Sequence, residues 1–80
     1  MALLTKRAQK DIDDLPEQMQ SKVSSVIDSL EGNPTIGWKL KGKLEGLRSI
    51  NVGRSHRILY AHGPSGITVK TVRPRRDVYR

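Results

Sequence analysis

The stretch LRSINVGRSHRILYAHGPSGITVKTV, residues 47–72, decides the fold of this 80-residue chain. Apolar and polar residues alternate in three of its segments, as they do in β-strands that bury one face: 47–52, 56–62 and 67–72. Gly53-Arg54-Ser55 and the run GPSG at 63–66 separate these segments and are typical of tight turns. Because such short links join neighbouring antiparallel strands, the stretch predicts an antiparallel sheet.

Upstream of this stretch, the first half of the chain predicts two helices. Apolar residues recur there at spacings of three and four, which places them on one helical face: Ile12, Leu15, Met19, Val23, Val26, Ile27 and Leu30. The longer helix is expected from about Pro16 to Glu31. A proline is tolerated in the first turn of a helix, and the Gly-Asn-Pro run that follows Glu31 ends it. Thr5 is expected to cap a shorter helix that carries Ala8 and Ile12. The two helices form a helical hairpin with one apolar side.

The hairpin and the sheet together predict one α+β domain over residues 1–80. The N-terminal helical hairpin packs on one face of a three- to four-stranded antiparallel sheet, with residues 2–4 as a short fourth strand at an edge. The opposite face of the sheet is left open. Trp38, in the Gly- and Lys-rich connection 37–46, is expected to pack against the helices or to cover that connection.

Alternation along the central strand predicts which side chains face the helices. Ile58 and Tyr60 share one face and are expected in the core. Arg57 and Leu59 lie on the other face, which makes Arg57 available to a ligand. A solvated surface arginine is the alternative for that position.

Composition limits the chemistry that the chain can carry. Without cysteine, neither a disulfide nor a thiolate metal site is available. His56 and His62 share a strand face about 20 Å apart, too far for one metal ion, so no metal or cofactor is expected. His56 is expected to make a structural hydrogen bond, and His62 to lie on the surface.

The location of the protein is also predicted from composition. No segment approaches the roughly 18 apolar residues that span a bilayer. The N-terminal run MALLTKRAQKD lacks the apolar region of a signal peptide. A cytoplasmic location without membrane contact is therefore expected.

Charge is concentrated in the second half of the chain. Residues 1–36 carry four basic and six acidic side chains, whereas residues 37–80 carry eleven basic and two acidic ones, within a net charge of +7. Such a cationic surface is the footprint of a polyanion binder, and nucleic acid is the expected polyanion. A solvated basic face that keeps the protein soluble is the alternative.

The available side chains suit cleavage of RNA by attack of its own 2′-hydroxyl. The sequence has no Gly-rich phosphate loop and supports no serine triad, but this reaction needs neither, because the substrate supplies nucleophile and phosphate. Paired guanidinium groups bind phosphate oxygens and stabilise the pentacoordinate state. A tyrosine or lysine whose pKa is lowered by nearby positive charge relays a proton, and an aromatic ring can instead hold a base by stacking.

Four segments, in this order, carry a resemblance to a known family: AQKDIDDLPEQ (8–18), KLKGKLEGL (39–47), GLRSINVGRSHRILY (46–60) and VRPRRDVYR (72–80). They resemble the RelE group of the RelE/ParE toxin superfamily over essentially the whole chain. The resemblance implies a RelE-like fold and a type II toxin that cuts mRNA codons in the ribosomal A site without a metal. It also implies three partners: the ribosome, mRNA and a neutralising cognate antitoxin.

The resemblance further implies roles for individual residues. Arg57 matches the strand arginine that contacts the scissile phosphate, and Arg75 matches the arginine that stabilises the transition state. Tyr79 matches the terminal tyrosine, which stacks on the substrate base or shares in proton transfer. Other basic residues are expected to bind the substrate or ribosomal RNA: Lys41, Lys43, Arg48, Arg54, Arg73 and Arg76.

One departure from the family pattern concerns the expected base. Two alternate positions of the first long strand, basic in well-known members, are Ser49 and Asn51, and neither is a base at neutral pH. Two other functions therefore stay open: a ParE-like toxin that inhibits DNA gyrase by protein contact, and a basic RNA-binding domain without catalysis. For residues 72–80, a solvated basic tail is the alternative to one wall of a phosphate site.

Overall fold

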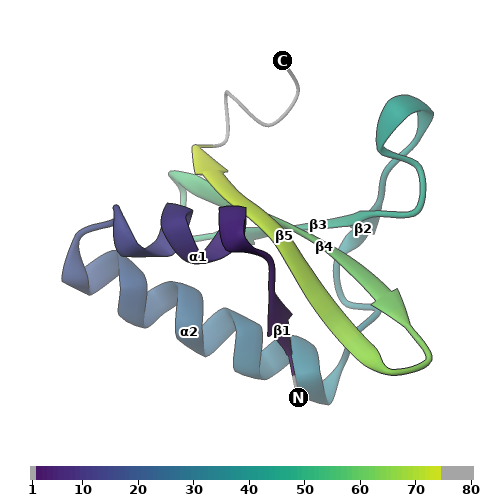
Figure 1. Ribbon diagram of the computed structural model, residues 1–80, viewed down its shortest axis with the longest axis horizontal. Coiled ribbons are helices and arrows are strands. Elements are labelled where there is room, and N and C mark those ends of the chain that lie inside the picture. The colour runs from purple at the N-terminus through teal and green to yellow at the C-terminus, as the bar shows by residue number, and fades with distance from the viewer. Residues whose placement is uncertain (1, 75–80) are drawn as a thin grey trace.

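The computed structural model describes residues 2–74, which form two helices and a five-stranded sheet (Figure 1). In chain order the elements are β1 (Leu3–Leu4), α1 (Lys6–Asp13), α2 (Glu17–Gly32), β2 (Trp38–Lys39), the 3₁₀ turn η1 (Gly42–Leu44), β3 (Arg48–Val52), β4 (His56–Gly63) and β5 (Gly66–Pro74). Both helices lie on the same side of the sheet (Figure 1). The predicted α+β architecture is confirmed.

The sheet has the strand order β1-β5-β4-β3-β2. Strands β3, β4 and β5 form the predicted antiparallel hairpins, with Ile58 opposite Ile50 on one side and Val72 on the other. The expected edge strand at residues 2–4 is present as β1, but it runs parallel to β5, so the fully antiparallel prediction is wrong. No tight turn joins β1 to β5, so their relative direction is not fixed by a hairpin as it is for β3, β4 and β5.

Strand β2 is a fifth strand that the sequence did not predict. It pairs antiparallel with β3 through only two residues, Trp38 and Lys39. Strand β1 is equally short. Two residues give no alternation from which a strand can be recognised.

The helical hairpin begins and turns as its sequence predicts. Thr5 caps α1, since its Oγ1 accepts from Ala8 N at 3.0 Å and also donates to Lys70 O at 2.8 Å. At the joint between the helices, Gln20 Nε2 donates to Ile12 O at 3.0 Å and to Leu15 O at 3.1 Å. Within residues 2–74, neither helix combines the length and apolar character needed to cross a membrane.

One buried cluster holds the helices to the sheet. Its members come from both helices and from β3, β4 and β5: Ala8, Val23, Leu30, Val52, Ile58, Tyr60, Ile67, Val69 and Val72. The rest of the predicted helical stripe packs against it partly buried: Ile12, Leu15, Met19, Val26 and Ile27. The predicted core positions of Ile58 and Tyr60 are confirmed.

A bulge in β5 keeps this strand's apolar residues on the core face. Leu59 pairs with Thr71 but Tyr60 pairs with Val69, so Lys70 is an extra residue in β5. Without it, Val69 and Val72 would point to opposite faces, because side chains alternate along a strand. The bulge lets both valines be buried while Lys70 is exposed.

A carboxylate from α1 accepts hydrogen bonds from the edge of β5, beyond the residues that pair with the short strand β1. Asp11 Oδ2 accepts from Thr71 Oγ1 at 2.6 Å and from Val72 N at 3.0 Å. Arg7 lies one turn earlier on α1, with its Nε 3.3 Å from Asp11 Oδ1. Asp11 thus gives a partner to a backbone N–H at the sheet edge, where an unpaired strand would otherwise be exposed.

Candidate nucleic-acid interface

The helices leave one face of the sheet uncovered. The open face is the name that we give to this side, and we define it by the following side chains, all placed there by strand pairing: Trp38 of β2, Ser49 and Asn51 of β3, Arg57 and Leu59 of β4, and Thr71 and Arg73 of β5. Strands β2 to β5 contain no aspartate or glutamate. The open face therefore joins cationic groups to an aromatic ring without carboxylates in its strands.

Arg57 lies at the centre of the open face and is partly buried. Its Nε donates to Asn51 Oδ1 on β3 at 2.9 Å. On β5, Arg73 is directly opposite Arg57, and its Nε donates to Thr71 Oγ1 at 3.3 Å. Like charges directly opposite one another weaken strand pairing, whereas a phosphate bound beside them interacts favourably with both. The structure thus brings together two of the predicted site residues, Arg57 and Arg73.

Trp38 is exposed on the open face, so the prediction that it packs against the helices or covers the connection is wrong. Its accessible fraction is 59%. Because Trp38 pairs with Ser49, alternation turns the indole away from the helices. Arg57 Cζ lies 5.8 Å from the centroid of the Trp38 ring, within the range of a cation–π interaction.

Two side chains from the sheet hold the loop that leads into β2. The buried Tyr60 hydroxyl donates to Pro34 O at 2.8 Å and accepts from Gly37 N at 3.0 Å. Arg48 Nη1 donates to Gly37 O at 3.0 Å and to Thr35 O at 3.3 Å. Arg48 therefore braces this loop from the side opposite the open face, and its predicted contact with RNA stays a prediction.

The two positions where a base was expected hold neutral side chains with local roles. Ser49 is fully buried, and its Oγ has no hydrogen-bond partner within the described residues. Asn51 instead receives a hydrogen bond from Arg57. The described part of the open face thus offers positive charge and an aromatic ring but no group that titrates as a base near neutral pH.

Several other predicted site residues lie away from the open face. Lys41 lines a hollow of about 510 Å³ together with Lys39, Arg48 and His62. Lys43 is exposed in η1. This hollow and the open face form two separate basic surfaces.

The remaining predicted residues have different settings. Arg54 is exposed in the turn between β3 and β4. His56 Nδ1 lies 2.7 Å from Ser55 Oγ, which confirms the expected structural hydrogen bond, and His62 is exposed as expected. Predicted residues beyond position 74 lie outside the described residues: Arg75, Arg76 and Tyr79. Among residues 2–74, no group of three His, Asp or Glu side chains is placed to hold a metal ion.

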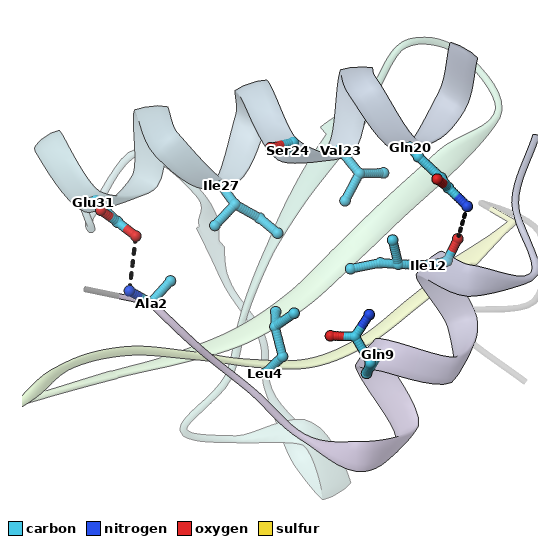
Figure 2. Close-up of a pocket in the computed structure, with 9 residues that line it drawn as sticks. All are labelled: Ala2, Leu4, Gln9, Ile12, Gln20, Val23, Ser24, Ile27 and Glu31. Carbon is cyan, nitrogen blue, oxygen red and sulfur yellow. Dashed lines mark hydrogen bonds between the residues drawn. The ribbon is translucent and has the colours of Figure 1, made fainter. Parts of the chain in front are cut away.

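An apolar groove of about 240 Å³ runs between the helical hairpin and β1 (Figure 2). Leu4, Ile12 and Ile27 point into it, and it is flanked by polar groups at both ends (Figure 2). At one end Ala2 N donates to Glu31 Oε1 at 2.8 Å. The adjoining β1 is exposed, with 60% of Leu3 accessible.

Solved structures that share this fold include proteins of toxin–antitoxin systems. A chain of the RelBE2 toxin–antitoxin complex from Mycobacterium tuberculosis is 26% identical, with a TM-score of 0.80 over 94% of this chain and 96% of that one. The YoeB/ParE toxin from Agrobacterium tumefaciens is 22% identical, with a TM-score of 0.80 over 92% and 96%. Isolated E. coli RelE is 20% identical, with a TM-score of 0.78 over 99% and 89%. The fold is therefore that of the RelE-like toxins.

Sequence comparison identifies the family. No curated protein matches the chain by sequence. The family described as "ParE toxin of type II toxin-antitoxin system, parDE" matches residues 2–79, and the chain belongs to that family. The resemblance to the RelE/ParE toxin superfamily is thereby confirmed.

Proposed function

We propose that this type II toxin cleaves ribosome-bound mRNA in the cytoplasm and is neutralised by a cognate antitoxin. The observation that carries the proposal is the pair of opposed guanidinium groups, Arg57 and Arg73, on an open face whose strands lack carboxylates. Such a pair binds phosphate oxygens through charge-assisted hydrogen bonds. The exposed Trp38 beside Arg57 adds a surface that suits an unstacked base.

In the proposed reaction the substrate's 2′-oxygen attacks the adjacent phosphorus and the bond to the 5′-oxygen breaks. The products are a 2′,3′-cyclic phosphate and a 5′-hydroxyl, and the 2′-hydroxyl loses a proton while the leaving oxygen gains one. Arg57 and Arg75 stabilise the additional negative charge of the pentacoordinate phosphate. Tyr79 stacks on the base or passes a proton, and Arg73 binds a neighbouring phosphate.

The apolar groove between the helical hairpin and β1 supports the antitoxin as partner. Proteins with the same fold were solved as toxin–antitoxin complexes, among them RelBE2 of Mycobacterium tuberculosis and YoeB–YefM of Staphylococcus aureus. In the present chain, the groove and the exposed Leu3 of β1 offer apolar surface to a partner segment. Burying such a surface stabilises a complex through the hydrophobic effect.

A translation assay tests the proposed cleavage. Ribosomes stalled on a defined mRNA are incubated with the protein, and new 5′ ends are mapped by primer extension. The wild-type protein is expected to cut within A-site codons, and Arg57→Ala to lower the rate about 100- to 1,000-fold, the usual effect of removing a transition-state donor. Lys22→Ala removes one positive charge from the exposed side of α2 and serves as the matched control. Intact mRNA with the wild-type protein would contradict the proposal.

Inhibition of DNA gyrase is the second candidate. Membership of the ParE family and the neutral side chains of Ser49 and Asn51 favour it. Gyrase supercoiling is therefore assayed with the same protein preparation. Loss of supercoiling together with intact mRNA would establish this function in place of mRNA cleavage.

A further inference from the structure

Trp38 has an unusual setting for the large aromatic residue of a small domain. Burial of a tryptophan contributes more to a thin core than burial of most other side chains, yet Trp38 stays mostly exposed while Tyr60 is fully buried. Its indole lies on the open face, in the same side-chain layer as Ser49 and Arg57. The chain thus gives up core burial at Trp38 and places an aromatic surface beside its cationic pair.

The backbone that carries Trp38 is held firmly. Gly37, the residue before it, is buried and bonded through both its N–H and its carbonyl oxygen to Tyr60 and Arg48. A Cβ at Gly37 would lie 2.6 Å from Tyr60 Oη and 2.8 Å from Ser49 O, closer than side chains are found to approach. A ring presented from a fixed backbone loses less conformational freedom when it binds a ligand.

Arg57 connects the indole to the rest of the open face. Its guanidinium lies over the ring, is tied to Asn51, and is directly opposite Arg73. Trp38 lies in the cross-strand row of Ser49, Leu59 and Thr71, whereas Arg73 lies two residues further along β5. Three strand spacings across the sheet and two residues along it separate the backbones of Trp38 and Arg73 by about 16 Å. An RNA strand with a base at Trp38 that crosses the sheet diagonally brings its flanking phosphates toward the two arginines.

We propose that Trp38 is a stacking platform for a nucleobase of single-stranded RNA whose flanking phosphates lie at Arg57 and Arg73. The inference rests on the proposed function, to which it adds a base-binding residue outside the C-terminal segment. The two arginines favour RNA over a peptide as the ligand, because an aromatic ring beside two positive charges matches the alternation of base and phosphate along a single strand. Asp11, the nearby carboxylate of α1, is already bonded to Thr71 and Val72 N.

Trp38 is the chain's single tryptophan, so its fluorescence reports this site directly. The protein is titrated at low salt with a short RNA oligonucleotide, with an abasic oligonucleotide of the same length, and with a poly-glutamate peptide. We expect saturable quenching by the RNA and little quenching by the abasic strand, although the two carry equal numbers of phosphates. Equal quenching by both strands would overturn the proposal, and stronger quenching by poly-glutamate would assign the surface to a protein partner.

Variants measure the contribution of the ring to affinity. With fluorescein-labelled RNA and anisotropy as the readout, Trp38→Ala is expected to weaken binding about 5- to 150-fold, and Trp38→Phe to retain most of the affinity. The dependence of affinity on salt should be the same for Trp38→Ala and wild type, because no phosphate contact is removed. Wild-type affinity of Trp38→Ala would overturn the proposal. Circular dichroism and thermal melts confirm that each variant is folded.

The ribosome assay separates this inference from the proposed function. If the wild-type protein and Trp38→Ala cut A-site codons equally well, the stacking site is refuted while mRNA cleavage stands. If the wild-type protein leaves mRNA intact but the RNA oligonucleotide still quenches Trp38 and the abasic strand does not, the stacking site stands while mRNA cleavage is refuted.

Discussion

Replacing Tyr60 by phenylalanine removes one buried hydroxyl that makes two hydrogen bonds to the loop before β2. Without it, Pro34 O loses a donor and Gly37 N loses an acceptor. A buried group left without its partner costs about 1–3 kcal/mol, so we expect Tyr60→Phe to lower the free energy of unfolding by about 2 kcal/mol. A chain of this length has about 4–12 kcal/mol in total, and the melting temperature should fall by about 8–16 °C.

The neighbouring glycine provides a double-mutant cycle for the same contact. In Gly37→Ala the new Cβ would lie 2.6 Å from Tyr60 Oη, and the resulting overpacking is expected to cost about 1–3 kcal/mol. In the double variant the clashing hydroxyl is absent, so the combined loss should be smaller than the sum by about 0.5–2 kcal/mol. Part of the loss remains, since the Cβ also approaches Ser49 O at 2.8 Å.

The matched control is Gly32→Ala, at the end of α2, where an added Cβ meets nothing within 4 Å. It should be neutral or stabilise by up to about 1 kcal/mol, because alanine favours the helix. Urea unfolding followed by circular dichroism gives the free energies, and the anisotropy of Trp38 fluorescence reports whether the loop has loosened. If Tyr60→Phe unfolds within 0.5 kcal/mol of wild type, or if the two losses simply add, the proposed bracing of this loop is incorrect.

Three further predictions concern the sheet edge, the helix cap and the open face. Asp11→Ala removes the carboxylate that bonds the edge of β5 and should cost about 2–3 kcal/mol in urea unfolding, whereas Asp28→Ala, on the exposed side of α2, should cost under about 0.5. Thr5→Ala removes the cap of α1 and should cost about 1–2 kcal/mol, and Thr5→Ser, which keeps the hydroxyl, should recover most of it; equal losses would exclude capping as the cause. Arg73→Ala should reduce the slope of log affinity for single-stranded RNA against log salt by about 0.7, and Lys22→Ala should leave it unchanged, unless the open face binds no phosphate.

The parts of the fold that the sequence predicted are those with a repeating pattern. Strands β3 to β5 and both helices are long enough for their apolar period to appear, and Thr5 is placed as a helix cap should be. The edge strands β1 and β2 contain two residues each and have no period of their own. The bulge at Lys70 did leave a signal, the spacing of three between Val69 and Val72 in a strand that otherwise alternates in twos.

The candidate site was predictable only where it depends on alternation. The outward position of Arg57 follows from its neighbours in β4, whereas its place opposite Arg73 depends also on the bulge at Lys70, which shifts the register of the hairpin by one residue. The orientation of Trp38 depends instead on how β2 pairs with β3, a contact between segments that no local pattern encodes. Asn51 is directly opposite Arg57 in the β3–β4 hairpin, so their proximity follows from the predicted turn and alternation, whereas the hydrogen bond between them depends on side-chain conformation.

The two faces of the sheet differ in how well their side chains are buried and hydrogen-bonded, and this difference favours the open face as the functional surface. On the helix side, apolar residues are buried together and the Tyr60 hydroxyl has both of its partners. On the open face, an aromatic ring stays in solvent, two arginines are opposed, and the Ser49 hydroxyl lacks a partner among the described residues. An exposed ring and a buried hydroxyl without a described partner each oppose folding, and natural chains concentrate such features where function requires them. A ligand with a base covers the ring of Trp38 and with its phosphates binds the two arginines, and RNA has both groups on one strand.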